Sequence, residues 1–214
     1  MIPLFKVSRP RGVEKMLAEV WDSGFVTEGE YSDKFEHEFS EFIENSNTSL
    51  VNSCTSALSI ASRMCDIKPG DEVITTPMTC MATNLPFVND GAKLIWADID
   101  PSTGNIDPGS VSKLISSKTK AIVGVHWAGL PFDIDSINSI AKQHGIKVVE
   151  DAAHALGATY KGKKIGSHSD YVCFSFQAIK HLTTADGGAI CSKSSIDDNR
   201  IKKLRWFGLD RKFK

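Results

Sequence analysis

Short apolar runs rich in β-branched residues alternate with helical patterns along most of this 214-residue chain. Strands that alternate with helices are typical of right-handed βαβ units, which build a doubly wound sheet. The sequence therefore predicts an α/β fold of three layers, α/β/α, around a mostly parallel sheet of roughly seven strands. The strands are expected at 49–54, 72–78, 93–98, 121–126, 147–151, 171–176 and 189–192. The helices are expected at 55–64, 79–89, 107–115, 133–144 and 196–207, with a further helical face at 35–43.

Chemically reactive side chains follow two of these apolar runs directly. Asp151 ends the run 147–151, Ser175 lies near the end of 171–176, and Lys180 falls in the turn after it. The carboxyl ends of parallel strands meet at one edge of a sheet, where ligands bind. An acid, a hydroxyl and an amine at that edge are what pyridoxal phosphate requires. The amine forms a Schiff base with it, and the acid keeps the pyridine nitrogen protonated.

Each of these side chains also has a plainer interpretation. Most lysines are exposed, although the flanking Ile179 and Leu182 favour partial desolvation of Lys180, which lowers the pKa of an amine. Asp151 could cap a helix that follows its strand, and His154 could be a surface histidine. A buried ion pair between Asp151 and a pyridinium is the sharper alternative. The residues alone leave these alternatives open.

A second candidate site is the helix start at residues 52–58, which carries several small hydroxyl side chains. Free backbone N–H groups and the helix dipole favour an anion at such a position. Simple N-capping by Ser53 or Thr55 explains the same residues. Combined with Ser175 and Lys180, the anion-binding interpretation becomes the stronger one.

Composition limits the function classes further. The formal net charge is −1 with scattered Lys and Arg, which predicts no nucleic-acid and no membrane partner, and the basic residues within 200–214 fit a solvated helix face. No stretch approaches a membrane span, and the first residues lack the apolar run of a signal peptide. Five cysteines without a CxxC pair predict free thiols and a cytoplasmic protein. The histidines show no ligand spacing, so no metal site is predicted.

These residues resemble the sugar-nucleotide aminotransferases of the DegT/DnrJ/EryC1/StrS family, which have the aspartate aminotransferase fold, type I. The resemblance covers essentially the whole chain. It rests on several blocks in order, GFVTEG at 24–29, GDEVI at 70–74, VEDAAHA at 149–155, FSF at 174–176, Lys180, and TTADGG at 183–188.

The resemblance implies roles for single residues. The lysine that carries pyridoxal phosphate falls on Lys180, the acid that binds the pyridine nitrogen on Asp151, and the contact to the 3′-hydroxyl on His154. The cofactor phosphate is expected at Thr55, Ser56 and Ser175. Cys80 takes the place where the family often stacks an aromatic residue on the ring, and is a candidate cofactor contact with simple packing as its alternative. Residues 27–29 are expected to border the substrate.

The resemblance also implies an activity and an organisation. The enzyme would move an amino group from an amino acid, with glutamate as the donor, to a keto-sugar nucleotide in amino-sugar or polysaccharide biosynthesis. A branch of the family has His at the position of Lys180 and dehydrates its substrate, so this lysine favours transamination. Residues 1–214 are expected to form the PLP-binding large domain, with 1–48 contributing to the active-site rim and the smaller C-terminal domain absent.

Two further expectations follow from the resemblance. A homodimer is expected because the fold type builds its active sites between subunits. The alternative function is a truncated, catalytically incomplete PLP-binding or dimerisation domain.

Overall fold

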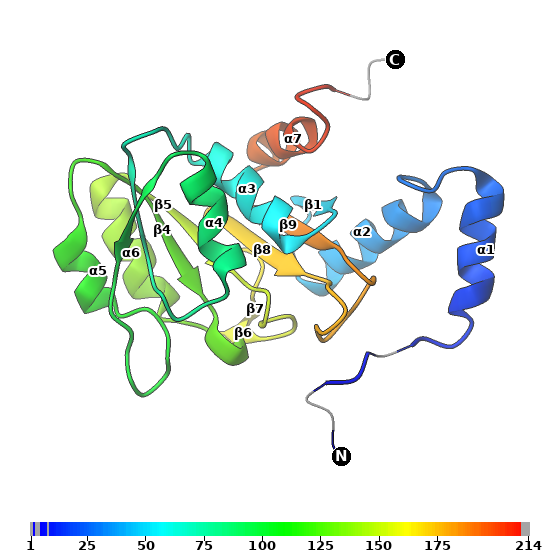
Figure 1. The fold of residues 1–214 in the computed structure, drawn as a ribbon, viewed down its shortest axis with the longest axis horizontal. Helices are drawn as coiled ribbons and strands as arrows, with labels where there is room; N and C mark the ends of the chain where they lie inside the picture. The colour runs from blue at the N-terminus through cyan, green and yellow to red at the C-terminus, as the bar shows by residue number, and fades with distance from the viewer. Residues whose placement is uncertain (1, 3–4, 8, 211–214) are drawn as a thin grey trace.

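The computed structural model describes residues 2, 5–7 and 9–210, and a seven-stranded sheet forms its centre (Figure 1). The spatial order of the strands is β1-β9-β8-β5-β4-β2-β3. Strand β9 pairs antiparallel with both β1 and β8, whereas the other neighbours pair in parallel, which confirms the predicted mostly parallel sheet. The strands are β1 (Thr48–Val51), β2 (Glu72–Thr75), β3 (Lys93–Trp96), β4 (Thr119–Val125), β5 (Lys147–Asp151), β8 (Tyr171–Ser175) and β9 (Gly188–Ser192).

Helices cover both faces of the sheet, as the three-layer prediction requires. Helices α3 (Cys54–Met64), α4 (Met81–Asn89) and α7 (Ser195–Leu204) pack on one face, around Leu58, Phe87 and Ile201. Helices α2 (Glu30–Phe42), α5 (Pro108–Leu114) and α6 (Ile134–His144) pack on the other. Because both faces are covered, every residue of β8 and β9 is buried, which explains their almost continuous apolar sequence.

Local capping fixes where several helices begin and end. The carboxylate of Asp133 accepts a hydrogen bond from the Ser136 N–H at the start of α6, and Gly145 ends the helix at φ 66°. A left-handed backbone of this kind favours glycine. At α5, Asp107 caps the helix and Pro108 is its first residue. The sequence predicts the Asp133 cap and the Gly145 stop, because both depend on neighbouring residues only.

Some boundaries differ from the prediction. The first strand ends at Val51, not at residue 54, because Ser53 is extended and caps a helix that already begins at Cys54. Helix α1 (Val13–Ser23) was not among the predicted helices; none of its residues is buried, and it stands clear of the sheet in Figure 1. A short hairpin of β6 (Thr159–Tyr160) and β7 (Lys163–Lys164) and a 3-10 turn at Trp127–Gly129 complete the elements.

The basic end of the chain is not simply a solvated helix face. Arg205 is largely buried, and its guanidinium donates to the Leu50 carbonyl at 2.9 Å and contacts Glu36 at 3.4 Å. Arg200 pairs with Asp66 at 2.8 Å on the surface. Helix α7 is thereby tied to β1 and α2 by specific contacts. The basic residues Arg211, Lys212 and Lys214 lie outside the described residues.

Within the described part of the chain, no helix is both long enough and apolar enough to span a bilayer.

Candidate active site

The predicted reactive residues gather at one edge of the sheet. Asp151 is the last residue of β5 and Ser175 the last of β8, and these two neighbouring strands run in parallel with Asp151 opposite Cys173. The turn that follows β1 leads into α3 at the same edge, where β9 begins with Gly188. The topology therefore brings the acid, the hydroxyl and the helix start together, as the strand order predicts.

Asp151 is 4% exposed, and its carboxylate is held by several donors. The hydroxyl of Thr83 donates to Oδ2 at 2.6 Å, and the backbone N–H of Ala153 donates to Oδ1 at 3.0 Å. The thiol of Cys54 lies 4.0 Å from Oδ1. Residues 152–158, directly after β5, form turns and no helix, so the alternative role of Asp151 as a helix N-cap is wrong. A buried, oriented carboxylate at a ligand-binding edge is suited to bind a cationic group.

Lys180 lies in a turn pinned to the end of β8. Its backbone N–H donates to the Gln177 carbonyl at 2.8 Å, and the Phe176 carbonyl accepts from both the Thr183 hydroxyl and the Thr184 N–H. The side chain of Lys180 is half-buried. Hydrogen bonds therefore hold the loop after β8 against the end of the strand. The loop keeps Lys180 beside the carboxyl edge of the sheet.

The apolar neighbours of Lys180 are themselves partly exposed to solvent. Ile179 and Leu182 are 49% and 39% exposed. That they desolvate the amine of Lys180 stays a prediction.

His154 is half-buried, and the charges of both candidate catalytic residues act on it. Desolvation lowers its pKa, the positive charge of Lys180 lowers it further, and the negative charge of Asp151 opposes them. Its Nδ1 is buried and has no hydrogen-bond partner among the described residues, while its ring meets Trp127 edge-on at 6.0 Å. A neutral imidazole with a free, buried nitrogen is available for a ligand.

The start of α3 is capped by Ser53, as the plainer interpretation held. Its hydroxyl accepts from the backbone N–H of Ser56 at 3.1 Å and donates to the Ser56 hydroxyl at the same distance. Thr55 is exposed in the first turn and is not the cap. Capping by Ser53 uses one N–H only, and the first turn of a helix has several that lack an intrahelical acceptor. The capping and anion-binding interpretations are therefore compatible.

Ser175 stands beside this helix start. It is 8% exposed, and its hydroxyl oxygen accepts from the Gln177 N–H at 3.4 Å. Its proton has no acceptor among the described residues, so the hydroxyl is free to donate to an anion.

Cys80 is exposed and is the N-cap residue of α4. It therefore belongs to the same helix start as Thr83, which contacts Asp151. It also acts electrostatically on Cys54, whose own pKa is raised well above the usual thiol value, first by burial and then by Asp151. The structure thus brings Cys80 into the neighbourhood of Asp151. No side-chain cap or ring contact explains its position among the described residues.

The sequence interpretation missed Thr83, although it touches Asp151 directly. Helical spacing does not indicate it, because Thr79 precedes the N-cap Cys80 and lies outside α4, although the hydroxyl oxygens of Thr79 and Thr83 lie 2.6 Å apart. Nothing in the sequence indicates which strand end this hydroxyl meets.

A buried polar pair lies on the opposite side of β5, behind the candidate site. His126 and Glu150 are both fully buried, and His126 Nε2 lies 2.9 Å from Glu150 Oε2. The backbone N–H of Phe132 donates to His126 Nδ1 at 3.3 Å, so the ring proton sits on Nε2 and is donated to Glu150. The His126 backbone also donates to the Asp151 carbonyl at 3.1 Å, which joins the ends of β4 and β5.

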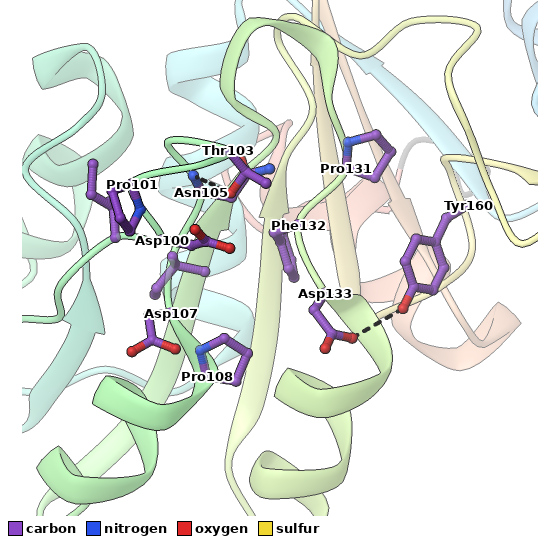
Figure 2. A pocket seen from close by; sticks show the side chains of 12 residues that line it. Asp100, Pro101, Thr103, Asn105, Asp107, Pro108, Pro131, Phe132, Asp133 and Tyr160 are labelled. Atoms are coloured by element: carbon purple, nitrogen blue, oxygen red, sulfur yellow. Dashed lines mark hydrogen bonds between the residues drawn. The ribbon is translucent and has the colours of Figure 1, made fainter.

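A cavity of about 600 Å³ lies outside this constellation (Figure 2). It is lined by acidic side chains that already serve local structure: Asp107 and Asp133 cap α5 and α6, and Asp133 also accepts from the Tyr160 hydroxyl. Asp100 binds the hydroxyl and the N–H of Ser102. None of the predicted site residues lines this cavity.

Comparison with known proteins decides the family. A model of the DegT/DnrJ/EryC1/StrS aminotransferase family matches residues 11–214. The chain belongs to this family. The spore coat polysaccharide biosynthesis protein SpsC of Bacillus subtilis is 40% identical over 195 residues, which are 91% of this chain and 50% of SpsC. This chain spans about half the length of the curated relatives it matches.

Solved structures agree with the family assignment. The sugar aminotransferase CalS13 from Micromonospora echinospora is 35% identical and superposes with a TM-score of 0.95, over 100% of this chain and 60% of its own. Spr1654 from Streptococcus pneumoniae, whose structure is a PLP form, is 32% identical with a TM-score of 0.86, over 92% of this chain and 54% of its own. These solved structures thus have the fold of this chain at 32% and 35% sequence identity.

Proposed function

We propose that this chain is the large domain of a pyridoxal phosphate-dependent aminotransferase that acts on sugars. The observation that carries the proposal is the buried carboxylate of Asp151, held by Thr83 and Ala153 at the edge of the sheet where Lys180 is also pinned. Family membership and the PLP form of Spr1654 support the cofactor. The names of SpsC and CalS13 support a sugar as the substrate.

The residues of this chain fit pyridoxal phosphate. A buried carboxylate needs a cationic partner, and the pyridinium nitrogen of the cofactor is one. The buried Nδ1 of His154 lacks a partner, and the 3′-hydroxyl of the cofactor would supply one. The helix start at Thr55 and Ser56 and the free hydroxyl proton of Ser175 suit a phosphate.

Each residue then has a defined task. When bound, pyridoxal phosphate supplies a ring that withdraws electrons from the carbon whose proton is removed. Asp151 would accept a hydrogen bond from the ring nitrogen and keep it protonated. The amine of Lys180 would hold the cofactor and would move a proton at the reacting carbon. Cys80, at the start of α4, would be a further contact to the cofactor.

We propose glutamate as the amino donor and a keto-sugar nucleotide as the acceptor, with residues 27–29 at the rim of the site. We also propose a homodimer, because α1 exposes Met16, Leu17 and Trp21 and buries none of its residues. The five free cysteines support a cytoplasmic location.

The test is an absorbance spectrum of the purified chain with pyridoxal phosphate, taken before and after addition of glutamate. We expect a visible band of covalently attached cofactor that bleaches with glutamate. Lys180→Ala should lack the band, whereas Lys142→Ala, an exposed lysine of α6, should keep it. A band that persists in Lys180→Ala would overturn the assignment of the lysine.

The alternative function makes a different prediction in the same experiment. If the chain is a catalytically incomplete cofactor-binding domain, the band will form through Lys180 but will not respond to glutamate. Absence of any band in the wild-type protein would overturn both cofactor-binding proposals and leave only a dimerisation domain.

A further inference from the structure

Thr83 makes the shortest contact to Asp151 that the structure contains. It lies in the first turn of α4, is 1% exposed, and its hydroxyl is 2.6 Å from Asp151 Oδ2. Asp151 belongs to β5, so this bond joins two elements that are 68 residues apart in the chain. A hydrogen bond to a charged group in a dry environment is stronger than one between neutral groups.

The bond also has a fixed direction. An ionised carboxylate only accepts hydrogen bonds, so Thr83 must donate its single hydroxyl proton to Asp151. The Thr83 oxygen then accepts from the Thr79 hydroxyl at 2.6 Å. The result is a chain of two hydrogen bonds in which Thr79 donates to Thr83 and Thr83 donates to Asp151. Thr83 has no further proton to donate.

The second oxygen of the carboxylate is restrained independently. The Ala153 N–H donates to Oδ1, and this bond closes a local turn within the same segment. Oδ1 also lies 4.0 Å from the Cys54 thiol, a long contact. The Thr83 bond is the short contact that ties the carboxylate to a different element, and it acts on Oδ2, so together with the Ala153 bond it sets the rotation of the carboxylate.

We propose that Thr83 is a positioning residue that holds the Asp151 carboxylate in the orientation needed to bind the pyridine nitrogen of pyridoxal phosphate. This inference rests on the proposed function. Thr83 acts through Asp151 and does not itself touch the ring nitrogen. Loss of the Thr83 hydroxyl should therefore weaken the binding only of those cofactors whose ring has a nitrogen for Asp151 to bind.

The first experiment measures the apparent Kd of pyridoxal phosphate by absorbance titration of the full chain. We expect Thr83→Val, which keeps the shape but loses the hydroxyl, to raise Kd about fivefold to tenfold. Thr83→Ser should restore most of the affinity. Thr48→Val is the matched control, because Thr48 is equally buried and donates to the Asn45 carbonyl, without contact to Asp151.

The same titration with a cofactor analogue separates positioning from general structural damage. In this analogue a C–H group replaces the ring nitrogen, so Asp151 has nothing to bind. We expect Thr83→Val and wild type to bind the analogue equally. An equal loss for both cofactors would overturn the proposal, because the variant would then have damaged the pocket as a whole.

A second measurement does not need the cofactor. Crystal structures of the cofactor-free wild type, Thr83→Val and Thr83→Ser should show the Asp151 carboxylate displaced in Thr83→Val only. An unmoved carboxylate in Thr83→Val would overturn the inference and leave the proposed function intact. Failure of the wild type to bind pyridoxal phosphate would overturn the proposed function, while these structures would still decide whether Thr83 orients Asp151.

Discussion

Gly188 lies against the peptide bond that joins Ser53 to Cys54, so closely that a Cβ at Gly188 would come 2.5 Å from the Ser53 carbonyl carbon. It would also come 2.6 Å from the Cys54 nitrogen and 2.8 Å from the Phe174 oxygen. All three are backbone atoms, which cannot rotate away as a side chain would. The first residue of β9 therefore sets how near the start of α3 can approach the sheet.

Gly188→Ala should destabilise the protein by about 2–4 kcal/mol, because overpacking against backbone forces strands or helix apart. It should also weaken pyridoxal phosphate binding by moving the helix start that we propose holds the phosphate. Urea unfolding and the absorbance titration measure the two effects. Gly109→Ala in α5 is the control, since its Cβ would meet nothing closer than 3.4 Å. Equal stability of the two variants would contradict the tight packing at Gly188.

The midpoint of the His154 titration should lie below 6.5 in the cofactor-free protein. Desolvation is the first cause of this lowered pKa and the charge of Lys180 the second, so Lys180→Ala should raise the midpoint toward 6.5. NMR of the imidazole resonances measures it, with Lys142→Ala as the control. An unchanged midpoint in Lys180→Ala would mean that the amine does not lie near the imidazole.

The same pKa predicts how stability depends on pH. The unfolded chain takes up the His154 proton more readily than the folded protein does. This contribution to stability is therefore complete above pH 6.5 and is lost as the pH falls below it. His154→Gln should reduce that loss, which urea unfolding at pH 5 and pH 7.5 would measure.

Glu150→Ala should cost about 3 kcal/mol or more of unfolding free energy, because it leaves the buried Nε2–H of His126 unpaired and opens a cavity. Glu150→Gln keeps an oxygen that can accept from His126, and it should cost less than about 1 kcal/mol. Urea unfolding compares the two variants. A small loss in Glu150→Ala would show that the pair does not stabilise the ends of β4 and β5.

A thiol reagent should modify one cysteine quickly in the native protein and all five after unfolding. Cys80 is exposed, whereas the other four are buried, and burial raises their pKa values, to about 12 for Cys191. Cys80→Ser should abolish the fast reaction. If Cys80 borders the cofactor, as we propose, loading with pyridoxal phosphate should slow its modification, and an unchanged rate would argue against that contact.

The sequence was most informative where structure depends on neighbouring residues. The Asp133 cap and the Gly145 stop of α6 are local features, and the structure contains both. The strands were found because residues buried on both faces give continuous apolar runs. Helix α1 was missed although Val13, Met16 and Leu17 follow helical spacing, and the structure leaves this apolar face exposed, not packed in the core.

What the sequence alone determined was the alternation of strands and helices and, through it, the edge at which Asp151, Ser175 and Lys180 would gather. These follow from local periodicity and from the rule that parallel strands end together. Only the tertiary structure decided which side chains meet there. Thr83 reaches Asp151, and Gly188 reaches the Ser53–Cys54 peptide, because the order of strands in the sheet brings distant segments into contact, and no local pattern records that order.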